Sequence, residues 1–283
     1  MNPDAPHPPG ADPWWSEAWH LDAASADGTG LTVRLECFPN QNVAWVWTYL
    51  VLPDRPGPVV VRDHEVPLPR QGLEVRAEGL WVELWCEAPL DHWTYGLEAF
   101  GLRLDDPADA LREEIGERVP VGLDIEWEAA GAPHTRAAVW PVEGFVQPGI
   151  VHGEVLLGRS RIELDCTGER RRSWGVRDFT APCWTVAGEV GDLTFHVAQT
   201  GGTTDGFVGD RAVEKARMET HRNTDGLPVA GRCVVADEWE IDIEVLGLAP
   251  VMLAPGAPLA RALCQYTIGS ESGVGWSTWF DPT

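Results

Sequence analysis

Residues 43–52 of the chain, which read VAWVWTYLVL, decide the fold class. This run is apolar throughout and rich in β-branched and aromatic residues, which favours a strand that is covered on both faces. With a side-chain period of two, Trp45, Trp47 and Tyr49 share one face of that strand. Residues 53–58, which read PDRPGP, then break the chain. The stretch therefore predicts a buried strand in a β protein.

Strand patterns also dominate the rest of the chain. The further candidates are residues 31–37, 80–87, 92–100, 121–128, 151–157, 160–166, 183–190, 193–199, 212–219, 229–236, 239–246, 262–268 and 274–280. Glycine and proline punctuate them at intervals of about ten residues, a spacing typical of antiparallel sandwiches and barrels. One helix is predicted over residues 106–115, where Asp106 can cap and Pro107 takes the first position. The predicted fold class is all-β, with one short helix.

A short repeat indicates two β units in tandem. The sequence DIEW at residues 124–127 is followed by AP at 132–133, and DIEV at residues 242–245 is followed by AP at 249–250. We expect an N-terminal β domain over residues 14–145 and a C-terminal β domain over residues 146–283. Residues 1–13, rich in proline, aspartate and glycine, are expected to form a loose arm.

The charge of the chain argues against several kinds of partner. Lysine and arginine number 21 against 44 aspartates and glutamates, for a formal net charge of −23, and Lys215 is the only lysine. Such a surface repels phosphate backbones and anionic lipid heads, so we expect no nucleic-acid partner. No apolar run approaches the roughly 20 residues of a membrane span. Residues 1–10 lack the features of a secretory signal, and we therefore predict a cytoplasmic location.

Neither a metal centre nor a nucleophilic triad is expected. The six cysteines, at positions 37, 86, 166, 183, 233 and 264, form no CxxC pair, so they are interpreted as free thiols. No HxH or HExxH spacing, no GxSxG elbow and no GxGxxG loop occurs. We therefore predict no metal and no cofactor.

Tryptophan is unusually frequent, with 15 copies against 3 tyrosines and 7 phenylalanines. An indole offers a large apolar area and a π face that attracts cations. These residues either fill a large β core or line a cavity for a large apolar ligand.

Four arginines gather in residues 168–179, which read GERRRSWGVRDF, within an otherwise strongly acidic chain. One interpretation is a buried turn that is locked by hydrogen bonds between Arg177 and an acid. The other is a direct role in binding or catalysis, because such a cluster at the apolar mouth of a barrel can orient a polar ligand group.

This segment resembles the signature Gly-x-Arg-x-x-Ser-Trp-Gly-x-Arg-Asp-aromatic of the hydroxyneurosporene synthase (CrtC-type carotenoid hydratase)/AttH-like superfamily, and more narrowly of a bacterial subgroup with tandem lipocalin-like domains. Further stretches carry the resemblance over nearly the whole chain after residue 13: residues 39–47, 79–83, 86–89, 92–101, 120–128, 151–154 and 261–264. The resemblance implies two lipocalin-like β-barrels packed side by side. Members of the wider superfamily hydrate carotenoid double bonds, and related tandem-barrel proteins cyclise polyketide or terpenoid chains.

The sequence departs from the family pattern at one place. Relatives commonly carry Asp-His before the Ser/Asn-Trp-Gly, whereas Arg171 and Arg172 stand at these positions here. If that pair moves protons in the hydratases, this chain cannot move them in the same way. A guanidinium fork also favours an anionic or carbonyl-bearing ligand.

Hydration or cyclisation of an alkene needs a protonated carboxylic acid in a dry pocket, where loss of solvent raises the pKa of the acid. It also needs aromatic ring faces, such as those of tryptophan, that stabilise a carbocation. His152 and Glu154 share a strand face, and His196 joins them if its strand lies alongside. The catalytic candidates are Asp178, which is the first choice as acid, Arg177, His152 and Glu154. The ligand-binding candidates are Trp47, Tyr49, Trp93, Tyr95, Glu98 (also a candidate acid), Arg172, Trp174, Trp184 and His196. For each of them, an ordinary ion pair or core position is the alternative.

Three hypotheses remain. The first is a cofactor-independent, hydratase- or cyclase-like enzyme. It would bind a large apolar molecule of isoprenoid, steroid or polyketide type in a tryptophan-lined barrel cavity and hydrate, isomerise or cyclise it. The second is a lipocalin-like carrier of the same hydrophobic ligands without chemistry. The third is an interaction protein with a filled core and no cavity above about 300 Å³. A hydrophobic small molecule is the expected partner, and a homodimer stays open.

Overall fold

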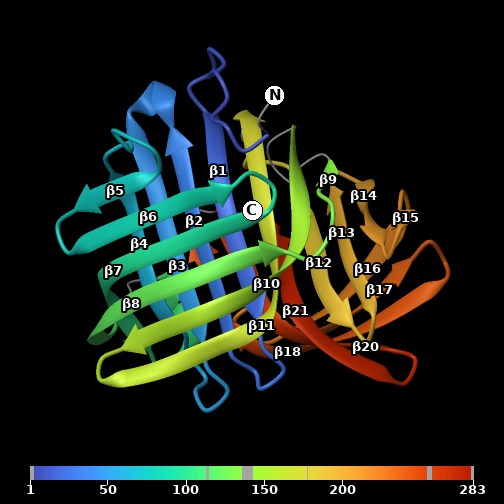
Figure 1. Ribbon diagram of the computed structural model, residues 1–283. Coiled ribbons are helices and arrows are strands. Elements are labelled where there is room, and N and C mark those ends of the chain that lie inside the picture. Colours follow the sequence, from blue (N-terminus) through green and yellow to red (C-terminus); the bar gives the residue numbers. More distant parts are fainter. Residues whose placement is uncertain (1–2, 113–114, 136–142, 177, 254–256, 282–283) are drawn as a thin grey trace.

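The structure is a computed structural model, and it describes residues 3–112, 115–135, 143–176, 178–253 and 257–281 (Figure 1). It consists almost entirely of β-strands, which form two antiparallel sheets. The predicted all-β fold is confirmed. Among the described residues, no helix has the length and the apolar character needed to cross a bilayer.

The first sheet contains β1 (Trp15–Ala24), β2 (Gly30–Phe38), β3 (Val43–Val51), β4 (Val59–Val66), β5 (Glu74–Ala77), β6 (Leu80–Ala88), β7 (His92–Leu104), β8 (Gly116–Ala129), β9 (His134–Thr135), β10 (Glu143–Leu157) and β11 (Ser160–Val176). The second sheet contains β12 (Cys183–Val190), β13 (Leu193–Thr200), β14 (Thr203–Val208), β15 (Arg211–Ala212), β16 (Ala216–Arg222), β17 (Pro228–Val235), β18 (Trp239–Leu248), β19 (Val251–Met252), β20 (Pro258–Ile268) and β21 (Glu271–Phe280). The short 3-10 helices η1 (Pro39–Gln41) and η2 (Pro107–Leu111) precede β3 and β8.

The first sheet curls into a barrel. Its strands follow the order β4-β3-β2-β1-β11-β10-β8-β7-β6-β5, and β4 also pairs with β7 through Val59↔Arg103 and Val60↔Leu102. In Figure 1 the blue strands β1 to β4 cross the green strands β7 and β8 steeply. The second sheet has the order β15-β14-β13-β12-β21-β20-β18-β17-β16 and stays open, without a pairing between its first and last strands among the described residues.

Alternation along β3 explains how the two sheets pack. Val46 and Leu50 belong to the core of the barrel. Trp45, Trp47 and Tyr49 lie on the opposite face and belong to an apolar cluster that is shared with the second sheet. The run at residues 43–52 is therefore covered on both faces, as its composition predicts.

The chain passes from the first sheet to the second between Val176 and Cys183. The domain boundary expected at residues 145/146 falls inside β10, which pairs with β8, β9 and β11 of the first sheet. β10 and β11 pair with each other and belong to the first sheet. Because β11 ends at Val176, the first sheet extends about thirty residues beyond that boundary.

Two local predictions need correction. Of the helix expected over residues 106–115, the described residues form only the 3-10 helix η2. Its cap is as predicted, since the Asp106 carboxylate accepts a hydrogen bond from the Ala108 amide at 2.9 Å. The loose arm expected over residues 1–13 is wrong for Asp4, because its side chain is buried in an ion pair with Arg170.

The arginine-rich segment is a strand and not a turn, because it forms the second half of β11, between β1 and β10. Its side chains alternate between two environments. Arg170 and Arg172 are buried inside the barrel, whereas Glu169 and Arg171 lie on the face that meets the second sheet. Arg177 lies outside the described residues.

Candidate functional site

Polar side chains cover the barrel face that packs against the second sheet. On β1, Trp19 and Leu21 belong to the barrel core, so His20 and Asp22 point outward from the barrel. The strand register places Arg171 of β11 opposite His20. These side chains are the start of a polar network between the two sheets.

Asp22 lies at the centre of this network. Its carboxylate accepts hydrogen bonds from the Arg261 guanidinium at 2.6 Å, from His20 at 2.8 Å and from Arg171. Burial by itself would raise the pKa of Asp22, but Arg261, His20 and Arg171 together outweigh it and hold the pKa well below its ordinary value. Asp22 is therefore ionised in the folded protein.

His20 is neutral at its buried position. Burial and the charge of Arg171 lower the pKa of His20 well below its ordinary value, against the raising effect of Asp22. Its Nε2 lies 2.8 Å from Asp22 and 3.0 Å from the Thr32 hydroxyl, while Arg34 donates to Nδ1 at 3.2 Å. The neutral ring thus carries its proton on Nε2.

Two arginines of the network lie over indole faces. The Arg34 guanidinium is 5.2 Å from the ring centre of Trp47, and the Arg261 guanidinium is 5.4 Å from that of Trp276. A buried cation gains from such a contact because the face of the ring is electron-rich. Trp47, a predicted ligand-binding residue, therefore stabilises a cation of the chain itself.

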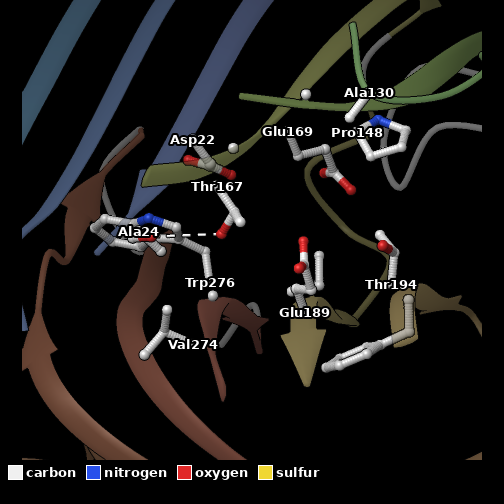
Figure 2. Close-up of a pocket in the computed structure, with 16 residues that line it drawn as sticks. Asp22, Ala24, Ala130, Pro148, Thr167, Glu169, Glu189, Thr194, Val274 and Trp276 are labelled. Atoms are coloured by element: carbon white, nitrogen blue, oxygen red, sulfur yellow. Dashed lines mark hydrogen bonds between the residues drawn. The ribbon is translucent and has the colours of Figure 1, made fainter. Parts of the chain in front are cut away.

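A cavity of about 80 Å³ lies beside the network, between the two sheets (Figure 2). Its lining includes Asp22, Thr167, Glu169, Glu189, Thr194 and Trp276. A buried water needs at least about 10–15 Å³ of such space, so the cavity has room for several waters or for one small group of a ligand.

Two glutamates face each other across this cavity. Figure 2 shows the carboxyl groups of Glu169 on β11 and Glu189 on β12 pointing toward one another. His196 Nδ1 lies 2.8 Å from Glu169 Oε2, and Arg171 Nε lies 3.3 Å from Glu169 Oε1. No atom of the described chain makes a hydrogen bond to Oε1. Burial, with a smaller effect of Asp192, raises the pKa of Glu189. The carboxyl group of Glu189 thus keeps its proton to higher pH, and the opposed carboxyl group of Glu169 is held by His196 and Arg171.

His196 is the predicted site residue that the structure brings to this place. It does not join His152 and Glu154, which lie on the outer surface of the barrel and have other partners. His152 Nδ1 is 3.2 Å from Asp165, and Glu154 forms an ion pair with Arg161. His196 lies on β13 of the second sheet, and sheet packing sets its contact with β11.

Asp178, the first choice as acid, is exposed and lies away from any buried acid of the network. Its carboxylate accepts hydrogen bonds from the hydroxyl and the amide of Thr180, both at 2.7 Å. These hydrogen bonds lower the pKa of Asp178, which is the opposite of what a proton donor requires. Glu98, a further candidate acid, is exposed on β7.

The predicted aromatic walls are dispersed. Trp47 and Tyr49 lie between the sheets, where the Tyr49 hydroxyl donates to the Pro250 carbonyl at 2.7 Å. Trp93 and Tyr95 lie in the core of the barrel, and burial raises the pKa of Tyr95 above its ordinary value. These two pairs therefore belong to different cores of the molecule.

The remaining predicted ligand-binding residues also have partners within the chain. Trp174 stacks on His7 with ring centres 3.8 Å apart. Trp184 donates to the Gln199 side chain at 3.2 Å, within the second sheet. Arg172 is buried inside the barrel. The predicted positions are therefore divided among several parts of the described structure and do not line one common cavity.

The sequence prediction missed His20, Asp22 and Arg261. Residues 15–24 read WSEAWHLDAA, and the alternation of Trp19 and Leu21 with the two polar side chains was the available signal for a strand with a polar face. Arg261 had no local signal, because its partner Asp22 is 239 positions away in the chain.

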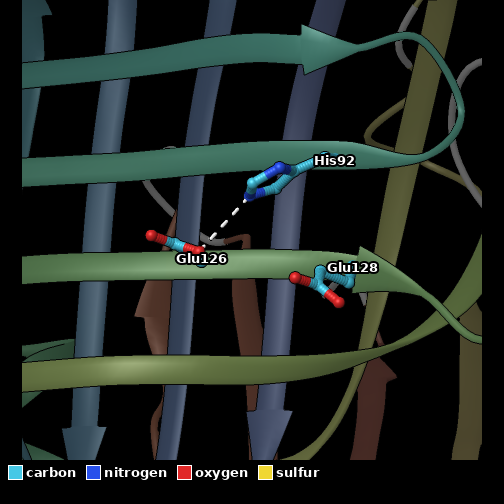
Figure 3. A group of neighbouring side chains, drawn as sticks. All are labelled: His92, Glu126 and Glu128. Carbon is cyan, nitrogen blue, oxygen red and sulfur yellow. Dashed lines mark ion pairs between the residues drawn. The ribbon is translucent and has the colours of Figure 1, made fainter.

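A further group of possible metal ligands lies on neighbouring strands β7 and β8 (Figure 3). One ligand atom each of His92, Glu126 and Glu128 lies within 4.8 Å of the others, and His92 Nε2 is 3.5 Å from Glu126. Both glutamates are exposed. Because an exposed ion pair gives the same geometry without a metal, this group is described here as a surface ion pair with a neighbouring acid.

A family model for a domain of unknown function, DUF7064, matches residues 2–283. The chain belongs to this family. No curated protein matches the sequence.

Solved structures show what fold the DUF7064 chain shares. A putative AttH protein from Nitrosomonas europaea aligns with a TM-score of 0.68 at 11% identity, over 95% of this chain and 93% of its own. Kievitone hydratase from Nectria haematococca aligns with a TM-score of 0.56 at 9% identity, over 95% of this chain and 89% of its own. At these identities the likeness establishes an AttH-like fold, as the resemblance implied.

Proposed function

We propose that this protein is a cofactor-independent hydratase that adds water to a carbon–carbon double bond in the cavity between the two sheets. The observation that carries the proposal is the pair of opposed carboxyl groups, Glu189 with a raised pKa and Glu169 held by His196 and Arg171. Two carboxyl groups whose environments differ in this way are the usual basis for an acid and a base in one site.

In the proposed reaction, Glu189 donates its proton to one carbon of the double bond, and the other carbon becomes electron-deficient. A water molecule forms a C–O bond to that carbon and gives a proton to Glu169. One hydrogen and one hydroxyl have then been added, and solvent carries the proton from Glu169 back to Glu189. The indole of Trp276 and the charge of Asp22, which also line the cavity, favour the transient positive charge.

His196 and Arg171 act on Glu169 as positioning residues. His196 fixes one carboxylate oxygen, and the Arg171 guanidinium lies beside the other. Within the proposal, these two contacts hold the Glu169 carboxyl group in the orientation that faces Glu189. Arg171 thus takes part where relatives carry an acidic residue, but it acts through its charge and not by moving protons.

The hydratase that shares the fold supports this reaction type, and the size of the cavity constrains the substrate. Only a small group fits between the sheets, so a large apolar molecule would place its double bond there and leave the remainder outside. Within the proposal, the substrate is isoprenoid-like. The proposal also takes the chain to be a relative of hydroxyneurosporene synthase and the two sheets to be tandem lipocalin-like domains. The cytoplasmic location and the homodimer stay predictions.

The test is water incorporation. The purified protein is incubated in H₂¹⁸O with linear isoprenoids and prenylated phenols, beginning with kievitone, and products are analysed by mass spectrometry. We expect a product that contains one labelled water. Glu189→Gln and Glu169→Gln are each expected to lower turnover by a factor of about 100 or more. Glu163→Gln is the matched control, because Glu163 is an exposed acid on the same strand, β11.

Turnover near the wild-type rate in Glu189→Gln would remove this residue from the reaction and contradict the proposal. Binding of these compounds by the wild-type protein without any labelled product would also contradict it, and would support the carrier hypothesis instead.

A further inference from the structure

Two buried arginines lie among aromatic rings at one end of the barrel. The Arg170 guanidinium is 5.0 Å from the ring centres of Trp93 and Trp127 and 5.1 Å from that of Phe145. The Arg172 guanidinium is 4.1 Å from a ring centre of Trp19. Both arginine residues are 1% exposed. Cations that are buried this deeply need an anionic partner in the same space.

The partner of Arg170 comes from the N-terminal segment of the chain. Arg170 Nη1 donates to Asp4 Oδ1 at 2.5 Å, and the Leu90 amide donates to Asp4 Oδ2 at 2.7 Å. Arg172 donates to the carbonyl of Ala5 at 3.3 Å. Asp4 and Ala5 thus reach the two arginines from a stretch that forms no strand of the sheet, and the Asp4 carboxylate is buried there.

Both guanidinium groups are held by other contacts as well. Arg170 Nη2 donates to the buried Gln147 side chain at 3.1 Å. Arg172 donates to Glu17 at 2.8 Å and to the Ala18 carbonyl at 3.3 Å. The two arginines therefore keep their orientation when Asp4 leaves, which is the condition for a preformed binding site.

Unpaired hydrogen-bond donors belong to the same group of arginines and indoles. The indole nitrogens of Trp19, Trp93 and Trp127 and the Nε atoms of Arg170 and Arg172 are buried, and none makes a hydrogen bond within the described chain. All five groups donate, and none accepts. Buried polar groups are nearly always paired, so this excess of donors points to a ligand that brings acceptor oxygens.

We propose that this end of the barrel binds an apolar or aromatic carboxylate, and that the Asp4 segment is a displaceable strap that occupies the site until the ligand arrives. The ligand's carboxylate replaces that of Asp4 on Arg170, and its apolar body lies beside the indole faces around the two arginines once the segment has left. This site shares no residue with the cavity of the proposed hydratase, so either proposal can fail without the other.

The test compares two probes of equal shape, 1-naphthoate and its neutral amide, by isothermal titration calorimetry at low ionic strength. Asp4→Ala removes the competing carboxylate, and we expect it to bind 1-naphthoate at least tenfold more tightly than the wild-type protein. We expect the affinity for the neutral amide to be the same in Asp4→Ala and in the wild-type protein. Asp12→Ala is the matched control. Asp12 also precedes β1, but its carboxylate accepts a hydrogen bond from the Trp14 amide and has no contact with the two arginines.

Two further variants guard against a folding defect. Asp4→Asn keeps the shape of the side chain, and we expect the same direction of change in 1-naphthoate affinity. The double variant Asp4→Ala/Arg170→Met leaves no unpaired charge at this position, so we expect it to fold. We also expect it to lose the increase in 1-naphthoate affinity that Asp4→Ala gives. The proposal is overturned if neither Asp4 variant binds 1-naphthoate more tightly than wild type, if the amide binds equally well, or if the double variant keeps the gain.

Discussion

The barrel end and the cavity between the sheets are both built on β11, from side chains that alternate along one strand. Arg170 and Arg172 supply the barrel end, and Glu169 and Arg171 supply the inter-sheet network. The barrel end has an excess of unpaired donors. The cavity has two opposed carboxyl groups, one of which is held by His196 and Arg171. One region therefore suits an anion, and the other suits proton transfer, although the sequence shows both as a single charged run.

The two regions also differ in the origin of their anions. Asp22 belongs to β1 and is fixed by the hydrogen bonds of the sheet on both sides. Asp4 belongs to a terminal segment that forms no strand. A charge that is carried by a strand cannot leave its partners without breaking the sheet, whereas a segment outside the sheet can leave without breaking any ladder hydrogen bond.

The largest expected effect is that of Asp22→Ala. The substitution leaves Arg261, which is 2% exposed, without its carboxylate partner, and it removes a partner of Arg171. We expect the free energy of unfolding to fall by about 3–5 kcal/mol, because an uncompensated buried charge remains. Urea denaturation that is followed by tryptophan fluorescence measures it, with the exposed Asp165→Ala as control. A loss below about 1 kcal/mol would show that the network is not coupled to folding.

Asp4→Ala is expected to cost less, about 1–2 kcal/mol in the same measurement, because Arg170 keeps its hydrogen bond to Gln147 and water can reach it once the ion pair is broken. Addition of 1-naphthoate should restore part of this loss in the variant and have little effect on the wild-type protein. Equal losses in Asp4→Ala and Asp22→Ala would mean that the terminal segment is as firmly fixed as β1, and the comparison above would be wrong.

The smallest expected effect is on the pH dependence of stability. The pKa of His20 is well below its ordinary value in the folded protein, so the unfolded chain binds a proton that the folded chain does not. The stability from this group is complete above the unfolded pKa of about 6.5 and falls as the pH drops below it, by at most about 1.4 kcal/mol per pH unit. Asp22, with a lowered pKa, adds a loss only at lower pH, below about 3.9. His20→Gln should reduce the slope of the free energy of unfolding against pH between pH 6.5 and 5. The substitution of the exposed His221 by Gln should leave this slope unchanged. An unchanged slope in His20→Gln would assign the titration to another group.

How far the sequence predicted the fold can be seen in particular strands. The apolar run at residues 43–52 predicted β3 and its two covered faces correctly, since alternation and composition are local properties. β1 was not predicted, although residues 15–24 are buried throughout. Its polar face is buried against the second sheet, and a local pattern does not distinguish a polar face in water from a polar face in a packed network.

The candidate site was harder to predict than the fold. His196 was named, but its partner Glu169 was not, and the acid that was preferred, Asp178, is exposed. The arginine cluster was correctly seen as unusual. What the cluster does depends on whether each arginine points into the barrel or toward the second sheet. This alternation exists because the segment is a strand, whereas one of the two interpretations of the sequence was a turn.

The sequence by itself determined the all-β class, the faces of the strongly patterned strands and the cap at Asp106, because each follows from side chains that are close neighbours in the chain. The tertiary structure alone decided which charges meet. Arg261 reaches Asp22 across the packing of two sheets, and Arg170 reaches Asp4 through the entry of the chain end into the barrel. Contacts between such distant positions are set by strand register and sheet packing, which no short stretch of sequence contains.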